Sequence, residues 1–461
     1  MDGPKQEVQN APEWRVPMPE DASATQDDEA GPALSLAEVA WAEVVSCTAM
    51  LKTKVSGFAE RVWAIGADDP RKVVYGIKLG MALTLVSLLF YVRPMYADIG
   101  GNAVWAIMTV VLAFEYTVGG TVYKGINGTV GTMSAAVLAL GVHWATRKYG
   151  HRFEPVVASG SVFLLATAAA FSRFIPTVMA RFDYGVTAFI FTYGFVAVSG
   201  YRVEELPMLA LQRVSSFSIG IFICVAVSVF IFPVWSGEEL RLLTARNMEK
   251  LAAAMEQIVE DCFAEPAKRQ HVARSEGYRF VLESKASEDA HANLAWWEPP
   301  HGKFSFRHPY DEYAQIGAAM RCCAYCLDSL NRCVVSGSGS EVLGVACTRL
   351  GTQCARVLSE ASCCVATMAM SRELGLAVAG MNAAVLELQG DLRALPHTPG
   401  VEHDETSSLM EAMPLFAVAL LLIEASGRVK GVVDAVEGLA TLAGFKQATA
   451  TKDTEMAAET K

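Results

Sequence analysis

Six stretches of continuous apolar residues follow one another in the first half of the chain. They cover residues 73–92, 104–120, 125–145, 155–171, 184–201 and 214–235. Each is close to the length of about 17–25 apolar residues with which a helix crosses a hydrocarbon core. The pattern predicts six membrane-spanning helices.

The second half of the chain has a different, amphipathic pattern, in which apolar residues recur three and four positions apart. This spacing predicts helices at residues 238–263, 313–330, 341–370, 371–392 and 408–442. The apolar stretch 414–423 is too short to span a membrane and predicts a buried core helix. Because no stretch alternates like a strand, we predict an all-α chain: a six-helix transmembrane domain followed by a cytosolic helical bundle.

A long connector, residues 264–309, separates the first two amphipathic helices. It contains the strings WWEPP at 296–300 and FSFRHP at 304–309. Aromatic residues and prolines over this length favour an ordered loop held against a surface. The domain boundaries that follow are 1–60 for a disordered or amphipathic N-terminal segment, 61–236 for the transmembrane domain, 237–445 for the cytosolic domain and 446–461 for a disordered tail.

Charge and cysteine content narrow the protein class. The chain of 461 residues is 52% apolar with a net charge of −11, which argues against a nucleic-acid partner, while its membrane half is locally basic. Nine of the 11 cysteines follow residue 260, at irregular spacings that suit free thiols in a reducing compartment. We therefore expect the C-terminal half in the cytosol and, with an even number of spans, both termini there.

The sequence lacks the usual motifs for metal binding and catalysis. Cys323 and Cys326 have ligand-like spacing, but no second Cys-x-x-Cys or His pair accompanies them. The chain has no phosphate-binding loop, metalloprotease motif or nucleophile elbow. We expect no metal, no cofactor and no enzyme activity.

Charged residues in and beside the apolar stretches are the main functional signal. Lys78 and Glu115 lie inside them, and five basic residues stand at or just beyond their ends: Lys124, Arg173, Arg181, Arg202 and Arg213. A charge at bilayer depth costs at least about 2.5–3.5 kcal/mol, so Lys78 and Glu115 should face protein or water. Spaced cations along a path through the membrane favour the passage of anions.

Several ordered strings carry a family resemblance. They are RKVVYGIKLG (71–80), WAIMTVV (105–111), FEYTVG (114–119), KG (124–125), RFIP (173–176), FDYG (182–185), YRVEE (201–205), FPVWSGE (232–238) and WEP (297–299). Together they resemble the plant aluminium-activated malate transporter family from about residue 60 to 335, and more weakly to 445. The lysines that many relatives carry after the RFIP string are replaced here by TVMA at 177–180.

The resemblance implies an anion channel that passes malate and inorganic anions such as chloride or nitrate, as a homodimer with six spans per subunit. It leaves open whether aluminium, voltage or malate opens the channel. Plasma-membrane and vacuolar members share these strings, and the plasma membrane is favoured because no vacuolar sorting signal is recognisable.

The charged and aromatic residues in and beside the apolar stretches have predicted roles, and each role has an alternative. Lys78, Lys124, Arg173, Arg181, Arg202 and Arg213 are predicted to line the pore; otherwise Lys78 snorkels, Arg202 pairs with a neighbouring glutamate, and the others anchor helix ends. Glu115 is predicted to pair with a basic residue, with or without a role in gating. Trp105 and Phe114, on the same predicted helix, either gate or pack.

Three further sets of candidate residues follow from the family resemblance or from charge. Trp297, Glu298 and Pro299 are interpreted as a structural clasp whose carboxylate accepts backbone or arginine hydrogen bonds. Phe230 and Phe232 lie in a segment that, in this family, is linked to inhibition by γ-aminobutyrate; alternatively they form an interfacial belt. Asp98, Glu204 and Glu205 are a candidate outer-face site for a hard cation, or are simply solvated.

Two other functions remain open. One is a proton-coupled exporter of organic or aromatic acids with the same layout, which a pH-coupled current would distinguish from a channel. The other is a membrane-tethered signalling scaffold, which would carry no current.

Overall fold

The computed structural model describes residues 36–68, 70–91, 103–149, 154–199, 206–263, 277–302, 304, 308–333, 341–394 and 405–447. In this part of the chain the predicted all-α class is confirmed. The exception is one parallel pair of two-residue strands, β1 (Ala369–Met370) and β2 (Lys446–Gln447), which the sequence did not predict. The predictions for residues 1–35 and 448–461, and for Asp98, Arg202, Glu204 and Glu205, lie outside the described residues.

The chain divides into two compact units, residues 1–72 and 73–461. In the first unit, α1 spans Leu36–Asp68 as one continuous helix, and the boundary predicted at residues 60–61 falls within it. Helix α2 (Pro70–Tyr91) begins at the end of the first unit and belongs mostly to the second.

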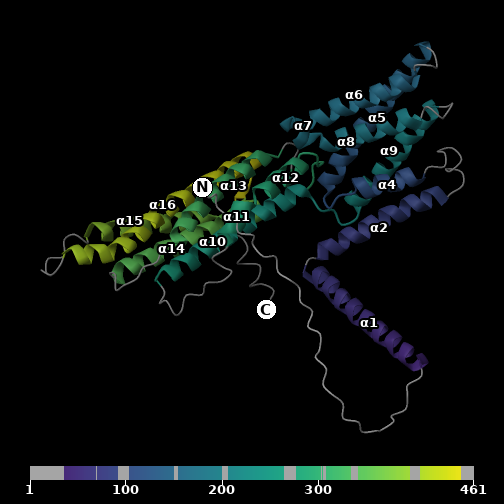
Figure 1. Cartoon of the computed structure of the whole chain (residues 1–461). Helices are drawn as coiled ribbons and strands as arrows, with labels where there is room; N and C mark the ends of the chain where they lie inside the picture. The colour runs from purple at the N-terminus through teal and green to yellow at the C-terminus, as the bar shows by residue number, and fades with distance from the viewer. Residues whose placement is uncertain are drawn as a thin grey trace, which may run out of the picture. The chain divides into compact units, whose positions relative to one another are not determined.

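The membrane half of the second unit consists of apolar helices that pack side by side (Figure 1). Helix α5 packs against α8 and α9, α4 against α9, and α6 against α8. At Gly131 of α5 a side chain would collide with the backbone oxygen of Gly185 in α8, so the two helices touch through their backbones. The remaining helix bounds are α4 Ala103–Ala113, α5 Val118–Tyr149, α6 Glu154–Ser172, α7 Pro176–Arg181, α8 Asp183–Ser199 and α9 Leu206–Phe230.

Three helices in the described residues are long and apolar enough to cross a membrane: Pro70–Tyr91, Val118–Thr146 and Leu206–Phe230. Val104–Ala113 and Val156–Ser172 are apolar but shorter. The predicted count of six spans therefore stays a prediction.

The second and third apolar stretches are divided differently from the sequence prediction. The stretch 104–120 was expected to form one helix, but α4 ends at Ala113 and α5 begins at Val118. Thr117 acts as the N-cap of α5, because its hydroxyl accepts a hydrogen bond from the Gly120 N–H at 3.1 Å. The break places Glu115 between two helices instead of inside one.

The last apolar helix begins earlier than predicted. The apolar run starts at residue 214, but α9 starts at Leu206 with Pro207 in its first turn, a position that proline favours. Arg213, expected just beyond a helix end, therefore lies within α9. This difference of eight residues, about two helical turns, determines where its guanidinium is placed.

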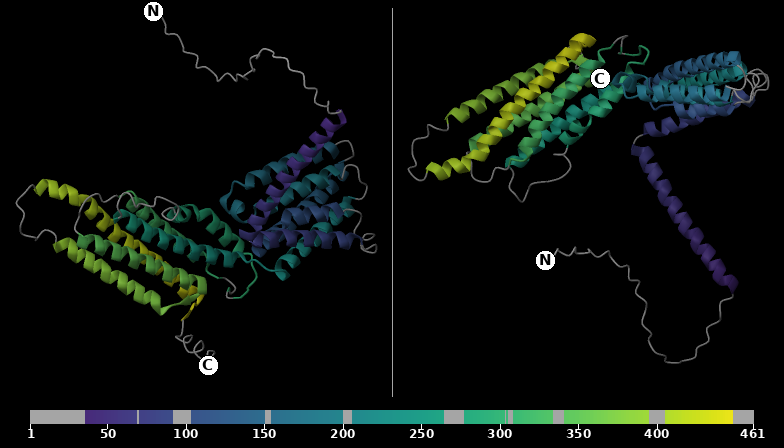
Figure 2. Two further views of the ribbon diagram at one scale, coloured as in Figure 1. Left: turned by 90° about the horizontal axis from the view of Figure 1, so that it is seen from below. Right: turned by 45° about the horizontal axis from the view of Figure 1, so that its top comes forward.

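The C-terminal helices form a bundle with its own core (Figure 2). The predicted amphipathic helices correspond to α10 (Ser236–Phe263), α13 (Tyr310–Asn331), α14 (Glu341–Thr367), α15 (Arg372–Ala394) and α16 (Glu405–Ala443). Met255, Ile316, Leu358 and Leu422 are among the side chains buried between them. The connector was predicted as a loop, but it contains two helices, α11 (Gly277–Glu283) and α12 (Lys285–Ala295), that pack against α10 and α13.

Candidate functional site

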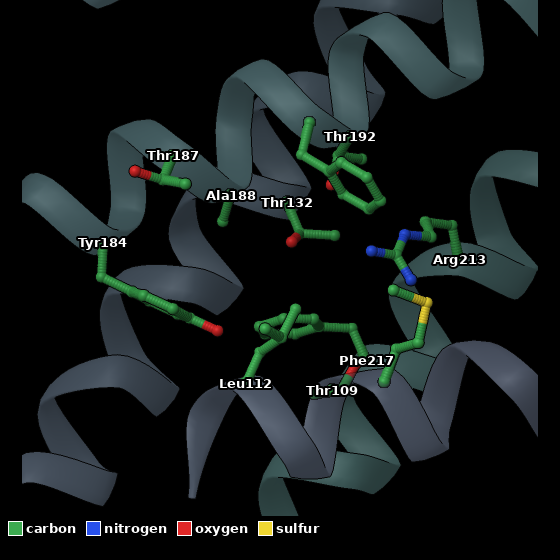
Figure 3. A pocket seen from close by; sticks show the side chains of 11 residues that line it. Thr109, Leu112, Thr132, Tyr184, Thr187, Ala188, Thr192, Arg213 and Phe217 are labelled. Atoms are coloured by element: carbon green, nitrogen blue, oxygen red, sulfur yellow. The ribbon is translucent and has the colours of Figure 1, made fainter. Parts of the chain in front are cut away.

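A pocket lies among four membrane helices, α4, α5, α8 and α9. Its volume is about 170 Å³, on the order of ten times the space that one water needs by this measure. Figure 3 shows the Arg213 guanidinium and the Tyr184 hydroxyl directed into the pocket from opposite sides. The lining residues are Met108, Thr109, Leu112, Thr132, Tyr184, Thr187, Ala188, Phe191, Thr192, Arg213 and Phe217.

Arg213 is the charged group of this pocket. Its side chain is buried, with 6% of the residue exposed, and its Nε and Nη1 have no hydrogen-bond partner in the protein. The guanidinium carbon lies 4.3 Å from the ring centre of Trp105 and 5.2 Å from that of Phe191. Aromatic faces offset part of the cost of burying a cation, but they leave its N–H donors unused. A buried guanidinium held in this way offers donors to an anion in the pocket.

Threonine hydroxyls belong to the same pocket as the guanidinium. The Oγ1 atoms of Thr132 and Thr192 are buried without a hydrogen-bond partner. Thr109 and Thr187 are satisfied locally, since their hydroxyls donate to the backbone oxygens of Trp105 and Asp183 at 2.8 and 3.0 Å. No Asp or Glu is among the described residues that line the pocket, so the polar groups of this mainly apolar pocket are hydroxyls and one positive charge, which suit an anion with several oxygens.

Lys78 is a second buried cation, in α2. Only 2% of the residue is exposed, and no described residue forms a hydrogen bond or ion pair with it. Its helix packs through Ala82 and Val86 against α4 and α9, although Lys78 does not line the pocket. The lysine is therefore inside the helix bundle instead of facing lipid.

Lys124 and Glu115 form an ion pair. The distance from Lys124 Nζ to Glu115 Oε1 is 2.5 Å, and the same ammonium donates to the Leu112 backbone oxygen at 2.9 Å. Lys124 also lies 5.3 Å from the ring centre of Tyr184, which lines the pocket. The pair brings one balanced positive and negative charge beside the pocket residue Tyr184.

The other predicted basic residues have different surroundings. Arg173 forms a two-pronged ion pair with Asp183, at 2.5 and 3.0 Å, on an exposed surface. Arg181, also exposed, lies 5.3 Å from the ring centre of Trp296. The structure thus brings only Arg213, among the predicted cations that it describes, into the pocket.

The predicted aromatic residues divide between the core and the surface. Trp105 contacts Phe191 and Phe195 as well as Arg213, so it shapes one wall beside the guanidinium. Phe114 is buried against Tyr75 of α2. Phe230 and Phe232 are 84% and 75% exposed at the end of α9.

Glu298 joins two helix N-termini. One oxygen, Oε1, accepts from the Gly119 N–H at 3.1 Å, at the start of α5, and from the Ser236 N–H at 2.5 Å, at the start of α10. The other, Oε2, accepts from the Gly237 N–H at 3.1 Å. Helix N-termini carry free N–H donors and a positive partial charge, so a carboxylate is the complementary group. We call these four residues the Glu298 clasp.

Burial raises the pKa of Glu298 from its ordinary value of 4.5 to about 7, while the N–H groups of Gly237, Ser236 and Gly119 act in the opposite direction.

Aromatic side chains beside the Glu298 clasp also contact one another. Trp297 lies edge-on to Tyr123 of α5 with ring centres 5.7 Å apart, and Trp235 stacks on His301 at 3.7 Å. The clasp therefore connects helix α5 to the C-terminal bundle through a carboxyl whose pKa is about 7.

No group of three or more potential metal ligands is present among the described residues. Cys323 is fully buried in the bundle core, and Cys326 contacts the Leu421 backbone oxygen at 3.7 Å, so their side chains serve packing.

Sequence reasoning missed the residues that complete the pocket: Thr132, Thr192, Tyr184, Phe191 and Phe217. Hydroxyl and aromatic residues are common in membrane helices, and nothing in their spacing singles them out. Pro207 was a usable signal, because proline in a first turn would have extended α9 toward residue 206 and placed Arg213 inside it.

Apolar helices long enough to span a bilayer, joined to a helical bundle, define a helical membrane protein. The sequence model described as "Aluminium activated malate transporter" matches residues 63–398. Aluminum-activated malate transporter 10 of Arabidopsis thaliana is 40% identical over 441 residues, covering 86% of this chain and 88% of that protein. Aluminum-activated malate transporter 1 of Triticum aestivum is 36% identical over 425 residues, covering 88% and 90%. The chain belongs to the aluminium-activated malate transporter family.

Proposed function

We propose that this protein is an anion channel that conducts malate, and with it inorganic anions such as chloride or nitrate. The observation that carries the proposal is Arg213, a buried guanidinium with two unpartnered donor atoms facing a pocket whose described lining includes no carboxylate. The names of the relatives, which are malate transporters, support malate as the substrate.

The pocket's chemistry supports a dicarboxylate. A malate dianion leaving water needs replacement for its hydration, which a guanidinium and hydroxyl donors supply at short range. Arg213 would take one carboxylate, while Thr132 and Thr192 offer further donors to the same ion. Arg213 is the one cation among the described residues that line the pocket, and a single cation binds weakly enough to release the anion, as conduction requires.

The other basic residues would act outside the pocket. Lys78 would provide a second buried positive charge along the path, and Lys124, Arg173, Arg181 and Arg202 would raise the local anion concentration at the mouths. A homodimer would double each of these charges. We propose the plasma membrane as the location, with both termini in the cytosol.

The principal alternative is a proton-coupled exporter of organic acids. The titrating group of the Glu298 clasp could favour it, because a carboxyl with a pKa of about 7 can exchange a proton at physiological pH. The clasp, however, lies at the junction with the cytosolic bundle and does not line the pocket. We therefore assign Glu298 to the coupling of the two parts and not to the transport of protons.

The reversal potential under voltage clamp tests the proposal. With a malate gradient and equal pH on both sides, a tenfold change in the gradient of a dianion should move the reversal potential by about 29 mV. A pH gradient imposed afterwards should leave the reversal potential unchanged. A shift with pH would favour the exporter, and the absence of any current above that of untransfected membranes would favour a signalling scaffold.

A further inference from the structure

Helix α1 has an exposed apolar stripe that the transport proposal does not use. Leu51, Val55, Phe58 and Val62 are 63%, 59%, 69% and 51% exposed. At 100° per residue these four side chains fall within a sector of about 60° on the helix surface. Such a stripe on a helix of 33 residues needs a partner or an apolar medium.

The charged residues of the same segment are arranged around this stripe. Lys54 and Arg61 border it on one side and Lys52 on the other, each about 70–90° from its centre. Glu60 lies about 170° away, on the opposite face. Basic side chains that flank an apolar stripe can extend outward to headgroup phosphates while their stems stay in the apolar region.

A second copy of α1 fits this charge pattern poorly. The stripe has the 4-3 spacing of a coiled coil, and in that register Lys52, Lys54 and Arg61 occupy the positions that flank the seam. Those positions normally carry complementary charges in the partner helix, whereas two copies would bring basic residues together in an antiparallel pair and oppose them with alanine or glycine in a parallel one. The pattern favours an anionic surface over self-association.

Chain connectivity places α1 at a membrane boundary. Helix α1 ends at Asp68, and α2, which is long and apolar enough to cross a membrane, begins at Pro70. Trp63, 80% exposed, lies one to two turns before this junction. Tryptophan is enriched where membrane meets water, and the covalent link to a spanning helix greatly raises the effective concentration of α1 at the bilayer surface.

We propose that α1 is an in-plane membrane anchor, with Leu51, Val55, Phe58 and Val62 among the acyl chains and with Lys52, Lys54 and Arg61 binding anionic phospholipid headgroups. This role is independent of which anion the protein transports.

Photo-crosslinking in the full-length protein tests the anchor. Benzoylphenylalanine is placed at Val55, at Phe58 and, as a matched control on the opposite face, at Glu60. The protein is reconstituted into phosphatidylcholine bilayers with and without phosphatidylserine, irradiated and analysed by mass spectrometry. We expect lipid adducts at positions 55 and 58 that increase with phosphatidylserine, and several-fold fewer at position 60.

A charge variant tests the headgroup contacts. The triple substitution Lys52→Gln, Lys54→Gln, Arg61→Gln should reduce the adducts at position 55 in phosphatidylserine bilayers, by up to about fivefold for each charge removed, whereas Glu60→Gln should not. Equal adducts at positions 55 and 60, or crosslinks at 55 between two copies or to another segment of the chain, would overturn the anchor. Adducts that ignore both phosphatidylserine and the triple substitution would overturn the anionic-lipid contacts.

Discussion

The Glu298 carboxylate accepts a hydrogen bond from the Gly119 N–H at 3.1 Å, although the two residues are 179 positions apart in the chain. The same carboxylate accepts from Ser236 and Gly237, so one side chain caps both α5 and α10. Helix α5 contributes Thr132 to the pocket. A change in the C-terminal bundle that moves Glu298 would therefore act directly on a helix that lines the candidate anion site.

Gly119→Ala should disrupt this junction. A methyl group at Gly119 would collide with the Leu294 backbone oxygen and lie 2.9 Å from Glu298 Oε1, so α5 and the connector must separate. Gly141→Ala, in the same helix, meets nothing within 4 Å and should be neutral or stabilising by about 0.5–1 kcal/mol. Thermal unfolding of the purified protein, followed by tryptophan fluorescence, and whole-cell current measure both effects. Equal behaviour of the two variants would contradict the close contact.

Glu298→Gln should change how stability depends on pH. Because the pKa of Glu298 is about 7 in the folded protein against an ordinary 4.5, the folded state binds a proton that the unfolded chain has not yet bound as the pH falls through this range. The free energy of unfolding contributed by this carboxyl is therefore lower above about pH 7 and rises toward about pH 4.5. The melting temperature of the wild type should rise relative to that of the variant as the pH is lowered across this window. A constant difference between the two would show that Glu298 does not titrate there.

The Glu115–Lys124 pair predicts a compensating double substitution. Glu115→Gln leaves the Lys124 ammonium uncompensated beside Tyr184 and should lower the malate concentration for half-maximal current, whereas Lys124→Gln leaves a carboxylate and should raise it. The double variant should return close to wild type, with a coupling of about 0.5–3 kcal/mol. Additive effects of the two single changes would mean that the residues act separately.

The pocket hydroxyls predict a change in selectivity. Thr132→Val and Thr192→Val keep the side-chain shape but remove donors that have no partner in the protein. A malate carboxylate would lose hydrogen bonds worth about 1.5–3 kcal/mol each, while chloride, a single spherical ion, would lose less. The permeability ratio of malate to chloride should fall in both variants. Thr187→Val, whose hydroxyl is engaged by Asp183, is the matched control and should leave the ratio unchanged.

The helices differ in how closely the sequence predicts their bounds. The amphipathic helices of the bundle were predicted closely because periodic burial marks them, as in α10, predicted at 238–263 and observed at Ser236–Phe263. The prediction of a single helix over the apolar stretch 104–120 was wrong, because hydropathy does not detect the Thr117 cap at the start of α5.

The candidate site was only partly predictable, for a similar reason. Arg213 was selected by its charge, but its position in the pocket depends on where α9 begins. The partners of Glu298 could not be predicted, since they are backbone N–H groups of distant residues, whose positions no side-chain pattern encodes.

Malate current of Arg213→Gln, compared with that of Arg173→Gln, tests the central claim most directly. Both substitutions remove one positive charge, but Arg213 is buried in the pocket, whereas Arg173 pairs with Asp183 on an exposed surface. At matched surface expression, we predict that Arg213→Gln reduces malate current at least tenfold, the loss expected for about 1.4 kcal/mol or more of charge-assisted binding, while Arg173→Gln reduces it less than twofold. Undiminished malate current in Arg213→Gln would contradict the account.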